Sequence, residues 1–229
     1  MTIRRISSFG DLHAMVRGYG AGHYIFRGEP GASFKLRPKY GRSAASTRSD
    51  ARGIEVAAMD AFARRGVPYV TPTPVNKWEW LAIAQHYGLA TRLLDWTGNP
   101  LVAAYFAVAD RPISERVLYA LPRYEFATVD QSRSPFDLEE VVVYEPSHIS
   151  TRIAAQAGLF TVHHRPGDVF AHPKLDRWVI DEDAVIDLSI EIDKYGFNRA
   201  TLFPGLEGIA SHVNDWHLRG ARREDPDTV

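Results

Sequence analysis

The run QHYGLATRLLDWTGNP, from Gln85 to Pro100, concentrates ionisable and aromatic residues in a stretch that folding alone would not demand. A buried helix or strand of this length normally consists mainly of aliphatic residues, because each unpaired polar group removed from water costs roughly 1–3 kcal/mol. We therefore expect the polar side chains of this run to pair with one another or to face a ligand. They are Gln85, His86, Arg92, Asp95, Trp96, Thr97 and Asn99.

The size and composition of the chain favour a single domain over residues 1–229 with its own core. Of the 229 residues, 45% are hydrophobic and 11% are aromatic, which is enough apolar material for a sizeable core without metal or disulfide staples. The motifs described below fall within about residues 22–213, and residues 218–229 form a short polar tail.

Residue periodicity and breaker residues predict an α+β fold, with a mixed, largely antiparallel sheet flanked by helices. Helices are expected over about 9–18, 49–65 and 77–87, and from Pro100 onward, with Asn99 or Thr97 as the cap of the last. Gly88 is expected to end the third helix, so the polar run lies between two apolar helices. Strands are expected over 23–30, 116–122, 139–146 and 159–164, whereas 183–196 is ambiguous.

Charge and terminal sequence exclude some classes of protein. The net charge is −1, so no global basic field draws this chain to nucleic acid, although cations outnumber carboxylates between Arg27 and Arg65. These cations fit either phosphate contacts or a solvated surface. Cysteine is absent, the N-terminus lacks the apolar core of a secretory signal, and no apolar run approaches the ~20 residues of a membrane span. We expect a cytoplasmic protein with no membrane partner.

Several short blocks carry a resemblance to a known family. They are FRG at Phe26–Gly28, LRP at Leu36–Pro38, QHYGLATRLLDWT at Gln85–Thr97, AAQAGLFTVH at Ala154–His163 preceded by Arg152, and TLFPGLEGIA at Thr201–Ala210. Their order and the long central block resemble the bacterial FRG-domain family. That family is similar in broad architecture to ADP-ribosyltransferases that use NAD, some of which modify nucleic-acid bases and act as toxins.

The resemblance implies an enzyme that uses NAD as a substrate to ADP-ribosylate a macromolecule, with DNA or RNA the favoured acceptor. It also implies a toxin or phage-defence effector with a neutralising antitoxin partner. On this reading Arg27, Arg37 or Arg92 contacts the pyrophosphate of NAD through forked hydrogen bonds. The other expected cofactor contacts are Trp96 or Tyr105 by stacking, and Gln85, Thr97 and Asn99 by hydrogen bonding.

Catalysis of this kind needs a carboxylate or amide beside the sugar that becomes positively charged. Asp95 is the first choice, because it lies in the densest polar cluster, and an ion pair with Arg92 that merely locks a turn is the alternative. Arg27 and His86 are the next two catalytic candidates. The alternative for Arg27 is a buried ion pair with a Glu or Asp, and the alternative for His86 is a helix-terminal role. The other candidates are Glu29, Glu55, Arg152, Gln156 and Glu207. Gln156 can position a ribose, but cannot act as a base, and the chain shows no late catalytic glutamate of the kind these transferases commonly use.

Other chemistries find less support in the sequence. His163, His164 and His172 lack the spacing of a zinc motif, so no metal is expected. The chain has no GxGxxG fingerprint, no GxxxxGK[ST] loop and no GxSxG elbow. The rivals to the transferase are a non-catalytic module that binds a nucleotide or nucleic acid, and a metal-independent nuclease that uses His86 and Arg27.

Overall fold

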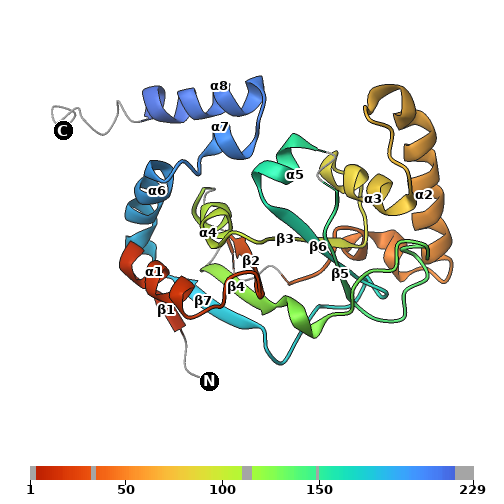
Figure 1. Ribbon diagram of the computed structural model, residues 1–229, viewed down its shortest axis with the longest axis horizontal. Coiled ribbons are helices and arrows are strands. Elements are labelled where there is room, and N and C mark those ends of the chain that lie inside the picture. The colour runs from red at the N-terminus through yellow and green to blue at the C-terminus, as the bar shows by residue number, and fades with distance from the viewer. Residues whose placement is uncertain (1–3, 32–34, 110–114, 148–149, 220–229) are drawn as a thin grey trace.

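The computed structural model describes residues 4–31, 35–109, 115–147 and 150–219, and within them one mixed sheet has seven strands. Their order is β1-β7-β4-β2-β3-β6-β5, with β1 parallel to β7 and the other neighbours antiparallel (Figure 1). The strands are β1 (Arg4–Ile6), β2 (Tyr24–Glu29), β3 (Leu93–Thr97), β4 (Arg116–Pro122), β5 (Val142–Tyr144), β6 (Gly158–Val162) and β7 (Asp176–Ile180). This confirms the predicted α+β class with a mixed, mostly antiparallel sheet.

Eight α-helices accompany the sheet in the described residues. They are α1 (Phe9–Arg17), α2 (Ala51–Gly66), α3 (Lys77–His86), α4 (Pro100–Val108), α5 (Thr151–Ala155), α6 (Val185–Lys194), α7 (Arg199–Leu202) and α8 (Leu206–Asn214). No helix of the described residues is long and apolar enough to cross a membrane. The polar tail expected over 218–229 lies, beyond Arg219, outside the described residues.

The helix predictions before residue 110 are confirmed, and their caps show why. Asn76 caps α3 by accepting a hydrogen bond from the backbone of Glu79, and Gly88 follows the helix at a φ of 88° that favours glycine. Asn99 caps α4, with Pro100 in its first turn. The ambiguous segment 183–196 contains α6, because its apolar residues recur at helical spacing.

The segment Leu93–Thr97 differs from the prediction, which placed it in a connection between two helices. It forms β3, because its side chains alternate between the two faces of the sheet, with Asp95 exposed and its neighbours buried. The strands β1 and β7 and the short helices α5 and α7 were also not predicted. Each is short, so periodicity gives it little signal, and β1 is stabilised by pairing with β7, far along the chain.

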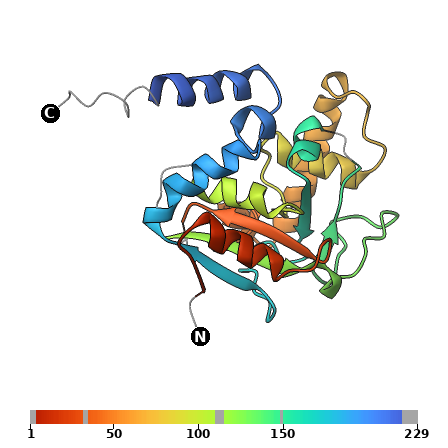
Figure 2. The same ribbon diagram turned by 60° about the vertical axis from the view of Figure 1, so that its left-hand side comes forward.

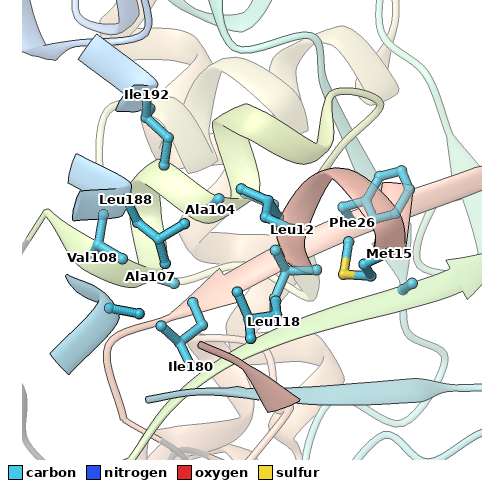
Figure 3. Packing of buried hydrophobic residues seen from close by; sticks show 14 residues of the cluster. Leu12, Met15, Phe26, Ala104, Ala107, Val108, Leu118, Ile180, Leu188 and Ile192 are labelled. Atoms are coloured by element: carbon cyan, nitrogen blue, oxygen red, sulfur yellow. The ribbon is translucent and has the colours of Figure 1, made fainter. Parts of the chain in front are cut away.

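The first of three hydrophobic clusters in the described residues lies between helices and the strands β1, β7, β4 and β2. Figure 3 shows α1, α4 and α6 contributing Leu12, Ala104 and Leu188, which meet Phe26 and Leu118 from the sheet. In Figures 1 and 2 these three helices lie beside one another over the same part of the sheet. This core fixes the position of α4 relative to β2.

The second core lies over the other end of the sheet. Leu93, Phe160 and Val162 on β3 and β6 pack there with Trp78 of α3 and Met59 of α2. Residues Phe26 and Thr97 are paired across β2 and β3, so the register places both cores on the same face of the sheet. A third cluster covers the opposite face and includes Leu94 and Trp96.

The sheet is nearly divided into two parts between β2 and β3. β2 pairs with β4 along its whole length, but among the described residues it meets β3 at the single pair Phe26–Thr97. Beyond this pair the strands diverge. The divergence leaves the backbone polar groups of β3 without the ladder partners that a full strand pairing supplies, so other groups must satisfy them.

Gly28, the glycine of the FRG triplet, lets α4 approach β2. A Cβ atom at this position would lie 1.8 Å from the carbonyl oxygen of Ala103 and 2.7 Å from the backbone nitrogen of Ala107. Both atoms belong to the helix backbone, which cannot move aside as a flexible side chain could. The absence of a side chain is therefore what sets the distance between α4 and the sheet.

We expect Gly28→Ala to lower the free energy of unfolding by about 3 kcal/mol or more, because α4 must be displaced. Gly53→Ala is the matched control, since Gly53 is exposed within α2 and a Cβ there meets nothing within 4 Å. The control should be neutral or stabilising by roughly 0.5–1 kcal/mol. Urea unfolding of both variants measures the difference, and equal midpoints for wild type and Gly28→Ala would contradict it.

Candidate functional site

A cavity of about 350 Å³ lies where β2 and β3 diverge, between the two cores. The helix-facing residues Phe26, Asp95, Thr97 and Phe160 line its floor, in agreement with the strand registers. Residues from α3, α4 and α5 surround it. Its polar and ionisable lining includes Arg27, Glu29, Gln85, His86, Asp95 and Arg152.

The guanidinium of Arg27 bridges the diverging strands. Its Nε donates to Oε1 of Glu29 at 2.7 Å, and its Nη2 lies 2.6 Å from the same oxygen. Its Nη1 donates to the backbone oxygen of Asp95 at 2.6 Å. Arg27 thus satisfies a β3 carbonyl at the point where β2 leaves the strand ladder. Its side chain is 18% exposed, so this bridge is partly shielded from water.

The carboxylate of Asp95 is held by a neighbouring amide yet open to solvent. Gln85 Nε2 donates to both of its oxygens, at 3.1 and 3.0 Å, and Thr91 Oγ1 donates to Gln85 Oε1 at 2.7 Å. These contacts fix the direction of the carboxylate. The side chain of Asp95 is 57% exposed, and Arg27 Nη1 is 3.8 Å from it, so the charge is only weakly compensated.

His86 and Arg152 bring two further groups to the cavity from α3 and α5. Burial lowers the pKa of His86 below its usual value, and the positive charge of Arg152 lowers it further. The ring is therefore neutral at pH 7 and able to accept a proton. Burial also lowers the pKa of Arg152, although arginine stays protonated.

Hydrogen bonds tie the cavity wall together at Thr97 and Gln156. Thr97 Oγ1 donates to the backbone oxygen of Gln156 at 2.7 Å, and Gln156 Nε2 donates to the backbone oxygen of Leu202 at 2.9 Å. These bonds join β3, α5 and α7. The AAQAGLFTVH and TLFPGLEGIA blocks, far apart in sequence, therefore meet beside the cavity.

Arg92 lies in the core rather than in the cavity. Its Nη2 lies 2.6 Å from Oε2 of Glu55, both side chains are 3% exposed, and its Cζ is 4.8 Å from the ring centroid of Phe136. The carboxylate of Asp95, the expected partner, accepts hydrogen bonds from Gln85 instead. We therefore assign Arg92 and Glu55 to the structure of the fold.

Several other predicted residues do not offer their side chains to the cavity. Trp96 borders it, but its side chain is buried on the opposite face of β3, with Nε1 donating to Thr161 Oγ1 at 2.9 Å. Asn99 is occupied as a helix cap, and Tyr105 packs against the first core. Arg37 is outside the lining, with a buried Nε that has no hydrogen-bond partner among the described residues.

Glu207, the late acidic candidate, is exposed in the first turn of α8 and lies outside the cavity lining. Figure 2 shows α8 extending away from the sheet. Two aromatic residues that line the cavity, Phe106 and Phe160, were also not identified by sequence analysis. Phe160 and Val162 are two residues apart on β6, so the alternation of side chains along a strand places both on the same face. This pattern is the signal that could have found Phe160.

Of the three histidines considered as metal ligands, His163 has a structural role. Its Nε2 lies 2.9 Å from Oγ1 of Thr161, which accepts the indole proton of Trp96, and its ring meets Phe170 edge-on. Among the described residues no group of three or more His, Asp or Glu side chains is placed to hold a metal ion.

Comparison with known proteins gives a match to one family model. The model of the FRG domain matches residues 22–116, which is less than half of the chain. The match includes β2, α3, β3 and α4, but ends before α5 and β6, which complete the cavity. No curated protein and no solved structure matches the chain.

We expect Arg92→Met to lower the free energy of unfolding by about 3–5 kcal/mol, because it leaves the Glu55 carboxylate buried without its partner. The double variant with Glu55→Leu should recover most of that loss, since no charge then remains in the core. Urea unfolding of the single and double variants measures both effects. A single variant as stable as the wild type would contradict the structural role of Arg92.

We expect His163 to make the fold sensitive to acid. Burial lowers the pKa of this ring to about 4, with smaller effects from His164 and Arg92. The unfolded chain takes up the proton near the ordinary value of about 6.5, whereas the folded ring resists it until about pH 4. Stability from this group is therefore complete above pH 6.5 and declines by about 3 kcal/mol as the pH falls to 4.

His163→Gln isolates this contribution from those of other titrating groups. Urea unfolding at pH 7 and at pH 4.5 should show a smaller acid-induced loss in the variant than in the wild type. The same loss in both proteins would show that His163 does not supply it.

Proposed function

Taking the match to the FRG domain at residues 22–116 as the premise, we propose that this protein cleaves NAD and transfers ADP-ribose to a macromolecule, with nucleic acid the first acceptor class. The observation that carries the proposal is the cavity, where the exposed carboxylate of Asp95 is held in place between Gln85 and the Arg27 bridge. The resemblance of the FRG family to ADP-ribosyltransferases supplies the reaction class.

The size and lining of the cavity suit part of a dinucleotide. Its volume of about 350 Å³ lies at the lower end of the range of small-molecule sites, about 300–1,000 Å³. Phe106 and Phe160 offer apolar ring surface for a nicotinamide or base, and Arg152 supplies positive charge. Aromatic surface, a cation and carboxylates together match the chemistry of NAD.

Asp95 is suited to stabilise the charge that develops during cleavage. The bond between the ribose C1′ and the nicotinamide nitrogen breaks, its electron pair leaves with nicotinamide, and the sugar becomes oxocarbenium-like. A carboxylate whose direction is already fixed stabilises that charge without reorganising during the reaction. Glu29 directs one oxygen to Arg27, and its Oε2 has no partner among the described residues, so it can accept a bond from a ribose hydroxyl.

Completion of the transfer requires a nucleophile to form the new bond to C1′ and to give up its proton. His86 is neutral at pH 7 and lies in the same cavity, so we assign it the role of accepting that proton. The neighbouring Tyr87 is 69% exposed, and its ring meets that of His86 at a centroid distance of 4.8 Å. It offers a surface on which an acceptor base can stack.

We expect Asp95→Asn to reduce NAD cleavage by about 100-fold or more, because the amide lacks the charge that stabilises the oxocarbenium-like sugar. Its side chain is exposed, so the melting temperature should change little. Asp60→Asn, which removes an exposed carboxylate from α2, is the matched control. Nicotinamide release measures the rate, and an unchanged rate in Asp95→Asn would remove Asp95 from catalysis.

The proposed activity is tested by incubating the purified protein with NAD and with DNA, RNA or protein, and by following nicotinamide release and the intact mass of each acceptor. An added ADP-ribose on an acceptor supports the transferase and identifies its class. NAD bound without cleavage overturns transfer in favour of a binding module. Cut nucleic acid without NAD consumption overturns it in favour of a nuclease.

The resemblance also extends to toxins, so we propose that the producing cell carries a neutralising partner. Expression of the protein alone should then slow growth, and Asp95→Asn should remove the effect. Equal growth with wild type and variant would contradict this part of the proposal.

A further inference from the structure

Two arginines flank one aromatic ring at the edge of the cavity. The Cζ atom of Arg152 lies 4.4 Å from the ring centroid of Phe203, and that of Arg199 lies 5.4 Å from the same centroid. Arg152 belongs to α5, whereas Arg199 begins α7 and Phe203 follows it. The ring thus holds two positive side chains near one another.

In the part of the chain that the structure describes, neither of these guanidinium groups is bonded to a carboxylate. Among the described residues no hydrogen bond or ion pair links the side chain of Arg152 or Arg199 to an acidic group. Burial lowers the pKa of the half-buried Arg152, the negative charge of Asp95 raises it in part, and the positive charge of Arg199 lowers it again. A partly desolvated cation beside a second cation is unfavourable unless an anion joins them.

Arg152 brings this arrangement into the cavity, whereas Arg199 and Phe203 lie outside its lining. Arg152 lines the cavity, and the ring of Phe203 meets that of Phe106, another lining residue, at a centroid distance of 6.0 Å. The hydrogen bond from Gln156 to the backbone of Leu202 fixes α7 against α5. An anion that enters the cavity can therefore reach Arg152 without rearrangement of these elements.

Arg27 is not available for the same task. Its Nε and Nη2 are directed to Glu29, and its Nη1 is directed to the backbone of Asp95. A phosphate could take these donors only by breaking the bridge between β2 and β3. Arg152 and Arg199 do not make this bridge, so a phosphate can bind them without breaking it.

We propose that Arg152 and Arg199 bind the diphosphate group of the dinucleotide whose nicotinamide end lies near Asp95. This inference rests on the proposed function. Two guanidinium groups present ten N–H donors and two positive charges, which match the oxygens and the charge of a diphosphate. We assign to this pair the contact with the pyrophosphate that the sequence analysis gave to Arg27, Arg37 or Arg92.

The experiment measures binding of ADP-ribose, which retains the diphosphate and lacks the bond to be cleaved, by isothermal titration calorimetry. Arg152→Gln and Arg199→Gln should each weaken binding about tenfold or more, since each removes charge-assisted hydrogen bonds. Arg65→Gln is the matched control, because Arg65 is exposed on α2 and outside the cavity lining. It should bind as the wild type does. Melting temperatures show whether each variant is folded. If Arg152→Gln does not fold, Arg199→Gln alone tests the site.

Inorganic pyrophosphate separates this inference from the proposed reaction. Competition between pyrophosphate and ADP-ribose in the wild type, lost in the two variants, supports the site whether or not NAD is cleaved. ADP-ribose binding that is unchanged in both variants overturns the site, even if NAD cleavage is found. Binding of a DNA or RNA oligonucleotide through these arginines, without any binding of ADP-ribose, also overturns it and assigns the pair to the acceptor.

Discussion

The bridge that Arg27 makes from β2 to β3 is the interaction on which the rest of the site depends. The two strands share the pair Phe26–Thr97 and then separate, which removes ladder partners from β3. The Arg27 guanidinium supplies one of the missing donors to the Asp95 backbone and is itself neutralised by Glu29. A polar side chain thus holds the sheet together at its opening. The carboxylate of Asp95 projects beside the bridge, because the backbone to which it is attached is fixed there.

The opening between the strands is maintained by two separate cores on one face of the sheet. The first core positions α4 against β2, and this close approach requires Gly28. The second core positions α3, whose last turn carries Gln85 and His86. Each core brings its own polar residues to the edge of the gap. The cavity is therefore a consequence of two packed units meeting at a weakly paired strand, and its polar residues avoid the cost of full burial.

The sequence predicted the fold class, the principal helices and a polar site in the run from Gln85 to Pro100. It could do so because helix caps and local periodicity carry these features. It could not distinguish the roles of the individual residues in that run, because these roles depend on which face of the strand a side chain occupies and on partners far along the chain. Asp95 and Trp96 are neighbours in β3 but point to opposite faces, and Arg92 is paired with Glu55, which lies 37 residues away. Arg199 and Phe203 come to lie beside Arg152 through the packing of α7 on α5, which no local pattern indicates.

The central claim is that the cavity between β2 and β3 holds NAD with its reacting sugar beside Asp95. A crystal structure of the wild-type protein with an NAD analogue whose nicotinamide bond cannot be cleaved tests it most directly. The account predicts that the analogue lies in the cavity, with the ribose C1′ near the Asp95 carboxylate and the Arg27 bridge intact. An analogue bound elsewhere on the protein, or a ribose turned away from Asp95, would contradict it.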